Sequence, residues 1–202
     1  REKIMKNKKL FAAALTAALA VSMMGTSVMA ATSAQGTTNF TYTPGTSGPI
    51  DPVDPGTEET STNNWMVVYP RSITLTDSNV ETGDKFTKGA AVTFTVKQKQ
   101  AGSDGSDAIT SDNIPQGIVV EAGGADADGN YDLSATSRTE KAKMQLAGFG
   151  GKKITNTVDE MGIILHDQPT QSGKAVIRDN ASVVEGNDYN VNVTFTFTNP
   201  GA

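Results

Sequence analysis

The sequence contains no cysteine, one histidine and one tryptophan among its 202 residues. The lack of cysteine excludes disulfide frameworks, cysteine zinc sites, thiol nucleophiles and iron–sulfur clusters. Positive charge is scarce beyond residue 30, since five of the 17 basic and one of the 22 acidic residues lie in the first 30 positions, leaving 12 basic and 21 acidic. The resulting net charge of −9 over residues 31–202 argues against nucleic acid as a partner.

The first 30 residues have the layout of a secretory signal peptide. Three lysines between residues 6 and 9 precede an apolar run over 10–24, and small residues follow up to Ala30. A run of this length is shorter than the roughly 20 residues that a helix needs to cross a bilayer. We expect cleavage after Ala30, with residues 1–4 upstream of an initiator at Met5 and no membrane span in the mature chain. Export without cysteine indicates a bacterial surface protein.

Residues 31–64 are expected to form an extended arm and linker. Thr, Ser, Gly, Pro and acidic residues dominate this segment, a composition that cannot bury enough apolar surface to order itself. One part of it, 38–43, alternates aromatic and polar residues and predicts a short strand with Phe40 and Tyr42 on one face. Such a tethered strand can dock on its own sheet or on that of a neighbouring molecule, and the sequence leaves both arrangements open.

Residues 65–202 have the pattern of a β domain. The clearest segment is Tyr189–Thr198, in which apolar side chains alternate with asparagine and threonine over ten residues. Other short apolar or alternating segments recur along the domain and are separated by glycine-rich turns. This pattern predicts an all-β fold, an antiparallel two-sheet β-sandwich preceded by the extended Pro/Thr-rich arm.

No constellation of catalytic residues stands out. His166 is the only histidine, so a Ser-His-Asp triad would have to include it, and no nucleophile motif such as G-x-S-x-G accompanies it. A surface or strand-end position is the expectation for His166. We therefore expect a protein that is not an enzyme.

The segment 126–132 offers the one candidate metal site. Four oxygen-bearing side chains occupy alternate positions, a spacing by which a tight loop can wrap calcium: Asp126, Asp128, Asn130 and Asp132. The segment departs from the EF-hand pattern in the place of its glycine and lacks the closing glutamate. Asp-Gly-Asn is also a favourable tight-turn sequence, and the turn is the preferred interpretation. No other cofactor is expected.

Trp65, the single tryptophan, stands where the linker gives way to the β domain. A large aromatic residue at such a position is expected to fill the core, because aromatic side chains supply much of the buried area of a small domain. The alternative is an exposed ring that contacts a glycan or a protein partner.

These features together resemble the WxL-domain surface proteins of Gram-positive bacteria. The likeness consists of the signal peptide, the Thr-rich strand over 37–46, the Pro-Val-Asp-Pro linker over 49–56 and the ending over 189–200. In that ending Phe195 stands where the family has tryptophan and Phe197 where it has leucine, and Trp65 begins a segment similar to the first Trp-x-Leu signature. The resemblance implies Trp65, Phe195 and Phe197 as residues that bind the wall or a partner.

Two functions follow from these observations. By its resemblance, the protein is expected to be secreted, non-catalytic and associated non-covalently with peptidoglycan or other surface proteins, acting in adhesion or surface complexes. The alternative is a structural fibre or pilus-like subunit, in which the strand with Phe40 and Tyr42 completes the sheet of a neighbouring copy.

Overall fold

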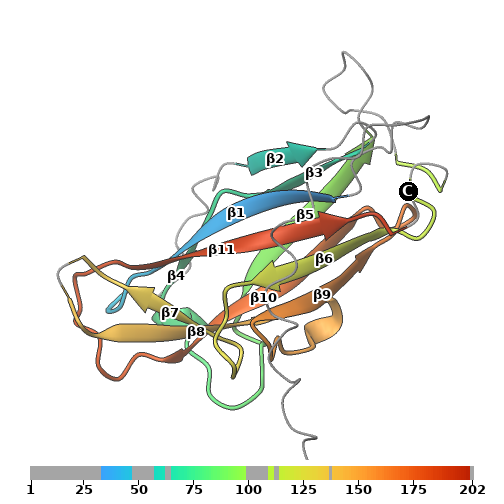
Figure 1. Cartoon of the computed structure of the whole chain (residues 1–202). Coiled ribbons are helices and arrows are strands. Elements are labelled where there is room, and N and C mark those ends of the chain that lie inside the picture. The colour runs from blue at the N-terminus through green and yellow to red at the C-terminus, as the bar shows by residue number, and fades with distance from the viewer. Residues whose placement is uncertain are drawn as a thin grey trace, which may run out of the picture.

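Alternating polar and apolar residues produce strands, and strands make up most of the structure (Figure 1). This computed structural model describes residues 33–46, 57–61, 65–98, 109–111, 114–136 and 138–200. The strands are β1 (Ser33–Tyr42), β2 (Thr57–Ser61), β3 (Trp65–Pro70), β4 (Ser72–Leu75), β5 (Ala90–Gln98), β6 (Ile118–Gly123), β7 (Asn130–Ser134), β8 (Lys141–Ala147), β9 (Val158–Ile164), β10 (Thr170–Asp179) and β11 (Tyr189–Thr198). Two short 3-10 helices, η1 (Asp77–Asn79) and η2 (Phe149–Gly151), join them. The all-β class predicted from the sequence is confirmed.

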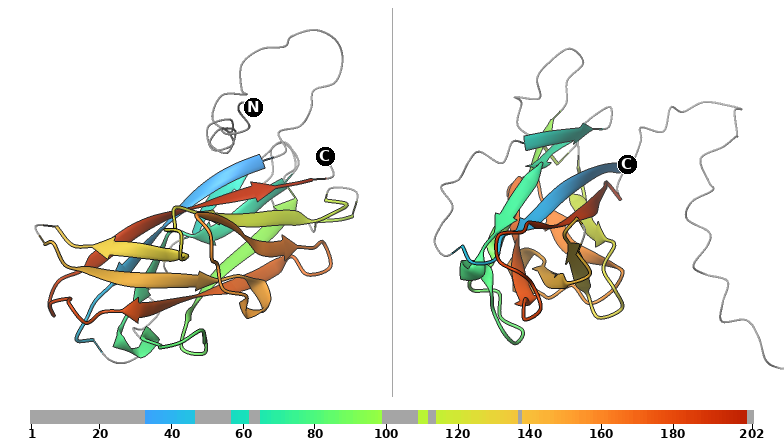
Figure 2. Two further views of the ribbon diagram at one scale, coloured as in Figure 1. Left: turned by 60° about the horizontal axis from the view of Figure 1, so that its bottom comes forward. Right: turned by 90° about the vertical axis from the view of Figure 1, so that its left-hand side faces the viewer.

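The strands join into one hydrogen-bonded sheet that curls into a nearly closed, barrel-like form (Figure 2). The main path runs β2-β3-β5-β10-β8-β7-β11-β1-β4, and β6 and β9 extend from β11. Every pairing between these strands is antiparallel except that of β1 with β4. The expectation of two separate sheets is not confirmed, because hydrogen bonding continues from one side of the core to the other.

Within the described ranges, no helix has the length and apolar character needed to cross a membrane.

A bend after Pro70 lets one stretch of chain change its pairing partner. Before the bend β3 pairs with β5, and after it β4 pairs with β1. Two bonds from β1 hold the corner: the Thr38 hydroxyl donates to the Pro70 carbonyl (2.7 Å) and the Asn39 amide donates to the Arg71 carbonyl (2.9 Å). The carbonyls at the bend are thus satisfied by β1, and the corner and β1 depend on each other.

β1 lies inside the sheet rather than in a separate arm. It pairs with β11 over ten positions, from Ser33 opposite Thr198 to Tyr42 opposite Tyr189, and its last four residues also pair with β4. The short strand expected over 38–43 is therefore longer, begins at residue 33 and docks on its own chain. The β domain expected over 65–202 gains two strands, β1 and β2, from the segment expected to be an arm and linker. The predicted signal peptide and residues 31–32, 47–56 and 62–64 of the predicted arm and linker lie outside the described residues.

A cluster of aromatic rings connects the two sides of the core. Phe94 of β5 lies edge-on to Phe195 and Phe197 of β11, with ring centroids 4.9 Å and 5.6 Å apart. Tyr69 of β3 extends the cluster, with its centroid 6.1 Å from that of Phe197. Such edge-to-face pairs stabilise by about 0.5–1.5 kcal/mol each beyond the area they bury.

Gly36 of β1 is required by this cluster. The residue faces inward, and a Cβ atom placed on it would lie 2.5 Å from two ring carbons of Tyr69. The Tyr69 ring is buried in a close-packed core, so it has little room to move aside. Glycine at this position lets the backbone of β1 lie directly against the ring.

We predict that Gly36→Ala lowers the free energy of unfolding by about 1–3 kcal/mol through this overlap. Urea unfolding followed by the fluorescence of Trp65, the single tryptophan, measures the change. Thr37→Ala is the matched control, since Thr37 is exposed on the same strand and its replacement should change stability by less than about 0.5 kcal/mol. Equal effects of the two variants would contradict the assigned contact.

Candidate functional site

The aromatic residues expected to bind the wall or a partner lie in the core. Trp65 is 1% exposed, and Phe195 and Phe197 are fully buried. In β11 the apolar residues of the alternating pattern point inward and the asparagine and threonine residues point outward. In this conformation none of the three rings can touch a wall polymer, so any part they take in binding is to position the outer face of the same strands. The core role weighed for Trp65 is the one observed.

Phe40 and Tyr42, expected to dock a strand, are both fully buried in β1. The Tyr42 hydroxyl donates to Asp77 Oδ1 (2.5 Å) and accepts from the Asn180 side-chain amide (2.8 Å). The other Asp77 oxygen accepts from the Gly45 amide (3.0 Å). Burial, followed by the bond to Asp77, raises the pKa of Tyr42 to about 12. These bonds fasten the end of β1 to η1 and to the segment after β10.

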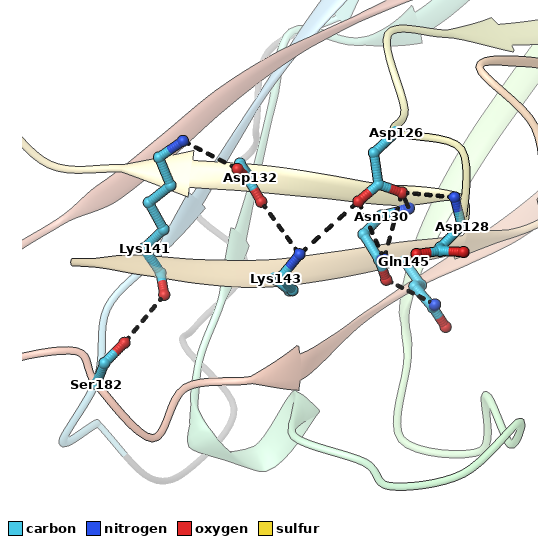
Figure 3. A network of polar contacts seen from close by, with 8 residues as sticks. All are labelled: Asp126, Asp128, Asn130, Asp132, Lys141, Lys143, Gln145 and Ser182. Atoms are coloured by element: carbon cyan, nitrogen blue, oxygen red, sulfur yellow. Dashed lines mark hydrogen bonds and ion pairs between the residues drawn. The ribbon is translucent and has the colours of Figure 1, made fainter. Parts of the chain in front are cut away.

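The candidate calcium residues form a capped turn (Figure 3). Asp126 Oδ1 accepts from the amides of Asp128 (2.9 Å) and Asn130 (2.8 Å), and these amides lower the pKa of Asp126. The side chain of Asn130 also donates to Asp126, and its oxygen accepts from Gln145 (2.8 Å). Asp126 and Asn130 are thus bonded within the turn and to β8.

Two lysines of β8 occupy the space beside these carboxylates. Lys143 Nζ lies 3.7 Å from both Asp126 and Asp132, and Lys141 Nζ lies 2.9 Å from Asp132 (Figure 3). All four side chains are exposed, so each ion pair contributes little to stability. Across the described ranges no group of three or more His, Asp or Glu side chains could hold a metal ion. The geometry is that of the tight turn preferred from the sequence.

His166 lies with Asp167 in the exposed turn that joins β9 to β10. The turn is closed by the bridge between Leu165 and Gln168. This is the surface position expected for His166.

An array of outward polar side chains, exposed or half-buried, lies on the outer face of β1 and β11. Its members, which we call the polar ladder, are Gln35, Thr37, Asn39, Thr41, Asn190, Asn192, Thr194 and Thr196. Directly opposite residues join across the strands: Asn39 donates to Asn192 (2.9 Å), and Thr41 to Asn190 (2.6 Å). None of the eight side chains is charged. Each has donor or acceptor capacity beyond a single bond to the opposite residue, which a ligand can use.

A shallow depression of about 290 Å³ adjoins the polar ladder. Its lining combines the ladder with β6 and β9: Gln35, Glu121, Gly123, Gly124, Val158, Asn192, Thr194 and Thr196. Glu121 supplies one carboxylate opposite Thr196, and Val158, 59% exposed, supplies an apolar edge. Amides, hydroxyls, a carboxylate and two glycines in this lining suit a ligand rich in hydroxyl and amide groups, such as a glycan.

The sequence pattern predicts only part of this surface. Alternation in Tyr189–Thr198 predicts the outward polar face of that strand, but no pattern predicts that the surface continues through Gln35 and across to Glu121. The signal for β1 was the matching alternation of Thr and Asn over 37–41. The contribution of Glu121 depends on the pairing of β6 with β11, which no local pattern encodes.

Comparisons of the chain with protein-family models, with curated proteins and with solved structures found no match.

The hydroxyl of Tyr131 in β7 has no hydrogen-bond partner among the described residues, although the side chain is only 1% exposed. Burial, and then the negative charge of Asp159, raise the pKa of this phenol. A buried donor without a partner destabilises a fold by about 1–3 kcal/mol. Tyr131 is therefore the opposite case to Tyr42, whose hydroxyl has two partners.

We predict that Tyr42→Phe lowers the free energy of unfolding by about 1–2 kcal/mol, whereas Tyr131→Phe leaves it unchanged or raises it by about 1 kcal/mol. The pKa of each phenol is raised in the folded state, so each phenol makes the folded state less stable relative to the unfolded state only as the pH rises above 10, the ordinary pKa; for Tyr42 this loss continues to about pH 12. Urea unfolding at pH 7 and at alkaline pH measures both effects. A loss at Tyr131→Phe as large as that at Tyr42→Phe would contradict the hydrogen-bond assignments.

Proposed function

We propose that the protein is a secreted, non-catalytic surface protein that associates non-covalently with the cell wall and acts in adhesion or surface complexes. The observation that carries the proposal is the polar ladder with its adjoining depression. Peptidoglycan strands present hydroxyl and N-acetyl groups in a regular array, and a row of outward amides and hydroxyls can hydrogen-bond to such an array. The ladder has no charge that would select a charged ligand instead.

The sequence supports the same proposal independently. The leader over 1–30 has the pattern of a signal peptide, and the layout of the chain resembles that of WxL-domain surface proteins. The net negative charge of residues 31–202 argues against nucleic acid as the partner.

Within this proposal the aromatic residues act through the fold. Phe195 and Phe197 anchor the inner face of β11, and the residues between them and before them form the ladder on the outer face. The proposal also includes the finer architecture expected from the sequence, in which the strands form two β layers around this core.

We predict that Asn39→Ala combined with Asn192→Ala weakens binding to purified cell wall by about tenfold, because an outward amide pair is removed. Sedimentation of the protein with wall fragments measures the change. The matched control is Thr93→Ala with Ser172→Ala, which removes an exposed side-chain hydrogen bond of 2.8 Å between β5 and β10, outside the ladder. Urea unfolding of each variant checks that the fold is retained.

Binding through uncharged groups should also change little between low and moderate salt. A native protein that stays in the supernatant at modest salt would contradict wall association itself. Equal weakening by the ladder variant and its control would contradict the ladder as the binding surface.

A further inference from the structure

β1 is an interior strand whose pairing partners lie far from it in the sequence. One edge pairs with β11, more than 140 residues away, and the other edge pairs with β4. Removing β1 would leave two strand edges unpaired and would take Phe40 and Tyr42 out of the core. We call the space between β11 and β4 the β1 groove, and it needs a strand to be complete.

The β1 groove recognises a particular sequence. At Gly36 it favours glycine, because a Cβ atom there would lie 2.5 Å from ring carbons of Tyr69. Further along it presents the Pro70 carbonyl to the Thr38 hydroxyl, and at its end it presents Asp77 to the Tyr42 hydroxyl. A strand that meets all three requirements is the β1 sequence itself, so the occupant that fits is β1 of this chain or of a second copy.

The connection to the rest of the chain is long enough for either arrangement. β1 ends at Tyr42 and β2 begins at Thr57, and residues 47–56 between them lie outside the described ranges. Ten residues span up to about 33–36 Å when extended. A strand of ten residues is itself about 34 Å long, so the connection is long enough for β1 to leave its own groove while it stays tethered to β2.

We propose that β1 is exchanged between copies, with β1 of one molecule filling the β1 groove of another. Each contact that β1 makes with the groove of its own chain is then made with the groove of the second chain, so strand pairing and burial are retained. Reciprocal exchange gives a closed dimer, and exchange in one direction gives an open fibre. The proposal goes beyond wall association and does not depend on it.

The absence of cysteine allows a direct test, because introduced thiols are the only thiols in the protein. Thr37 and Thr194 are directly opposite on β1 and β11, and both are exposed. A chain with Thr37→Cys and a chain with Thr194→Cys, each comprising residues 31–202 and hence every described residue, are mixed in urea, refolded together at high concentration and oxidised. Mass spectrometry then measures the disulfide between peptides containing positions 37 and 194.

Strand exchange predicts a disulfide-linked pair of the two chains, with about tenfold more disulfide between the two different chains than a control mixture gives. The control pairs Thr37→Cys with Thr93→Cys, an exposed residue of β5 that does not face β1. A single chain carrying both Thr37→Cys and Thr194→Cys is the reference, because it gives the disulfide yield expected when positions 37 and 194 face each other.

The proposal would be overturned if the mixture gave no more disulfide between chains than the control mixture, while the doubly substituted chain formed its disulfide within one molecule. Failure of the doubly substituted chain to form any 37–194 disulfide would overturn it too, because the pairing of β1 with β11 would then be wrong. The outcome is independent of wall binding, so the two proposals can fail separately.

Discussion

The insertion of β1 between β11 and β4 is the interaction on which the rest of the structure depends. It joins the first described residues to the last strand over ten paired positions and closes the corner after Pro70. The inward side chains of β1 complete the core, and its outward side chains supply half of the polar ladder. A single strand therefore connects the stability of the domain, the continuity of its curled sheet and the surface proposed to bind the wall.

The alternation of residues explains why core and candidate site cannot be separated. In β11 each buried aromatic residue is followed by an outward threonine or asparagine, so the rings fix the spacing and direction of the polar groups. Phe94 holds this strand from the opposite side of the core through Phe195 and Phe197. Replacement of a core ring would disturb the outer face without touching a ligand, and a loss of binding in such a variant would not identify a contact residue.

The sequence was sufficient for the all-β class, for the inward face of Tyr189–Thr198 and for the tight turn at Asp126. It was not sufficient for the full length of β1, because two of its inward positions are Gly36 and Thr38 rather than apolar residues. The first is small because the Tyr69 ring fills the space, and the second is polar because its hydroxyl binds a buried carbonyl, so neither gives an apolar signal. The single sheet was likewise hidden, since partners change within one stretch of chain at Pro70 and the pairings join residues far apart in sequence.

The most direct test of this account is complementation of a chain that lacks β1. Residues 57–202 are prepared alone and with a synthetic peptide of residues 31–46, and Trp65 fluorescence during urea unfolding reports whether the core is formed. The account predicts no cooperative transition without the peptide, and a cooperative one with it that is lost when the peptide carries Phe40→Asp. A cooperative transition at the native midpoint in the absence of the peptide would contradict the central role of β1.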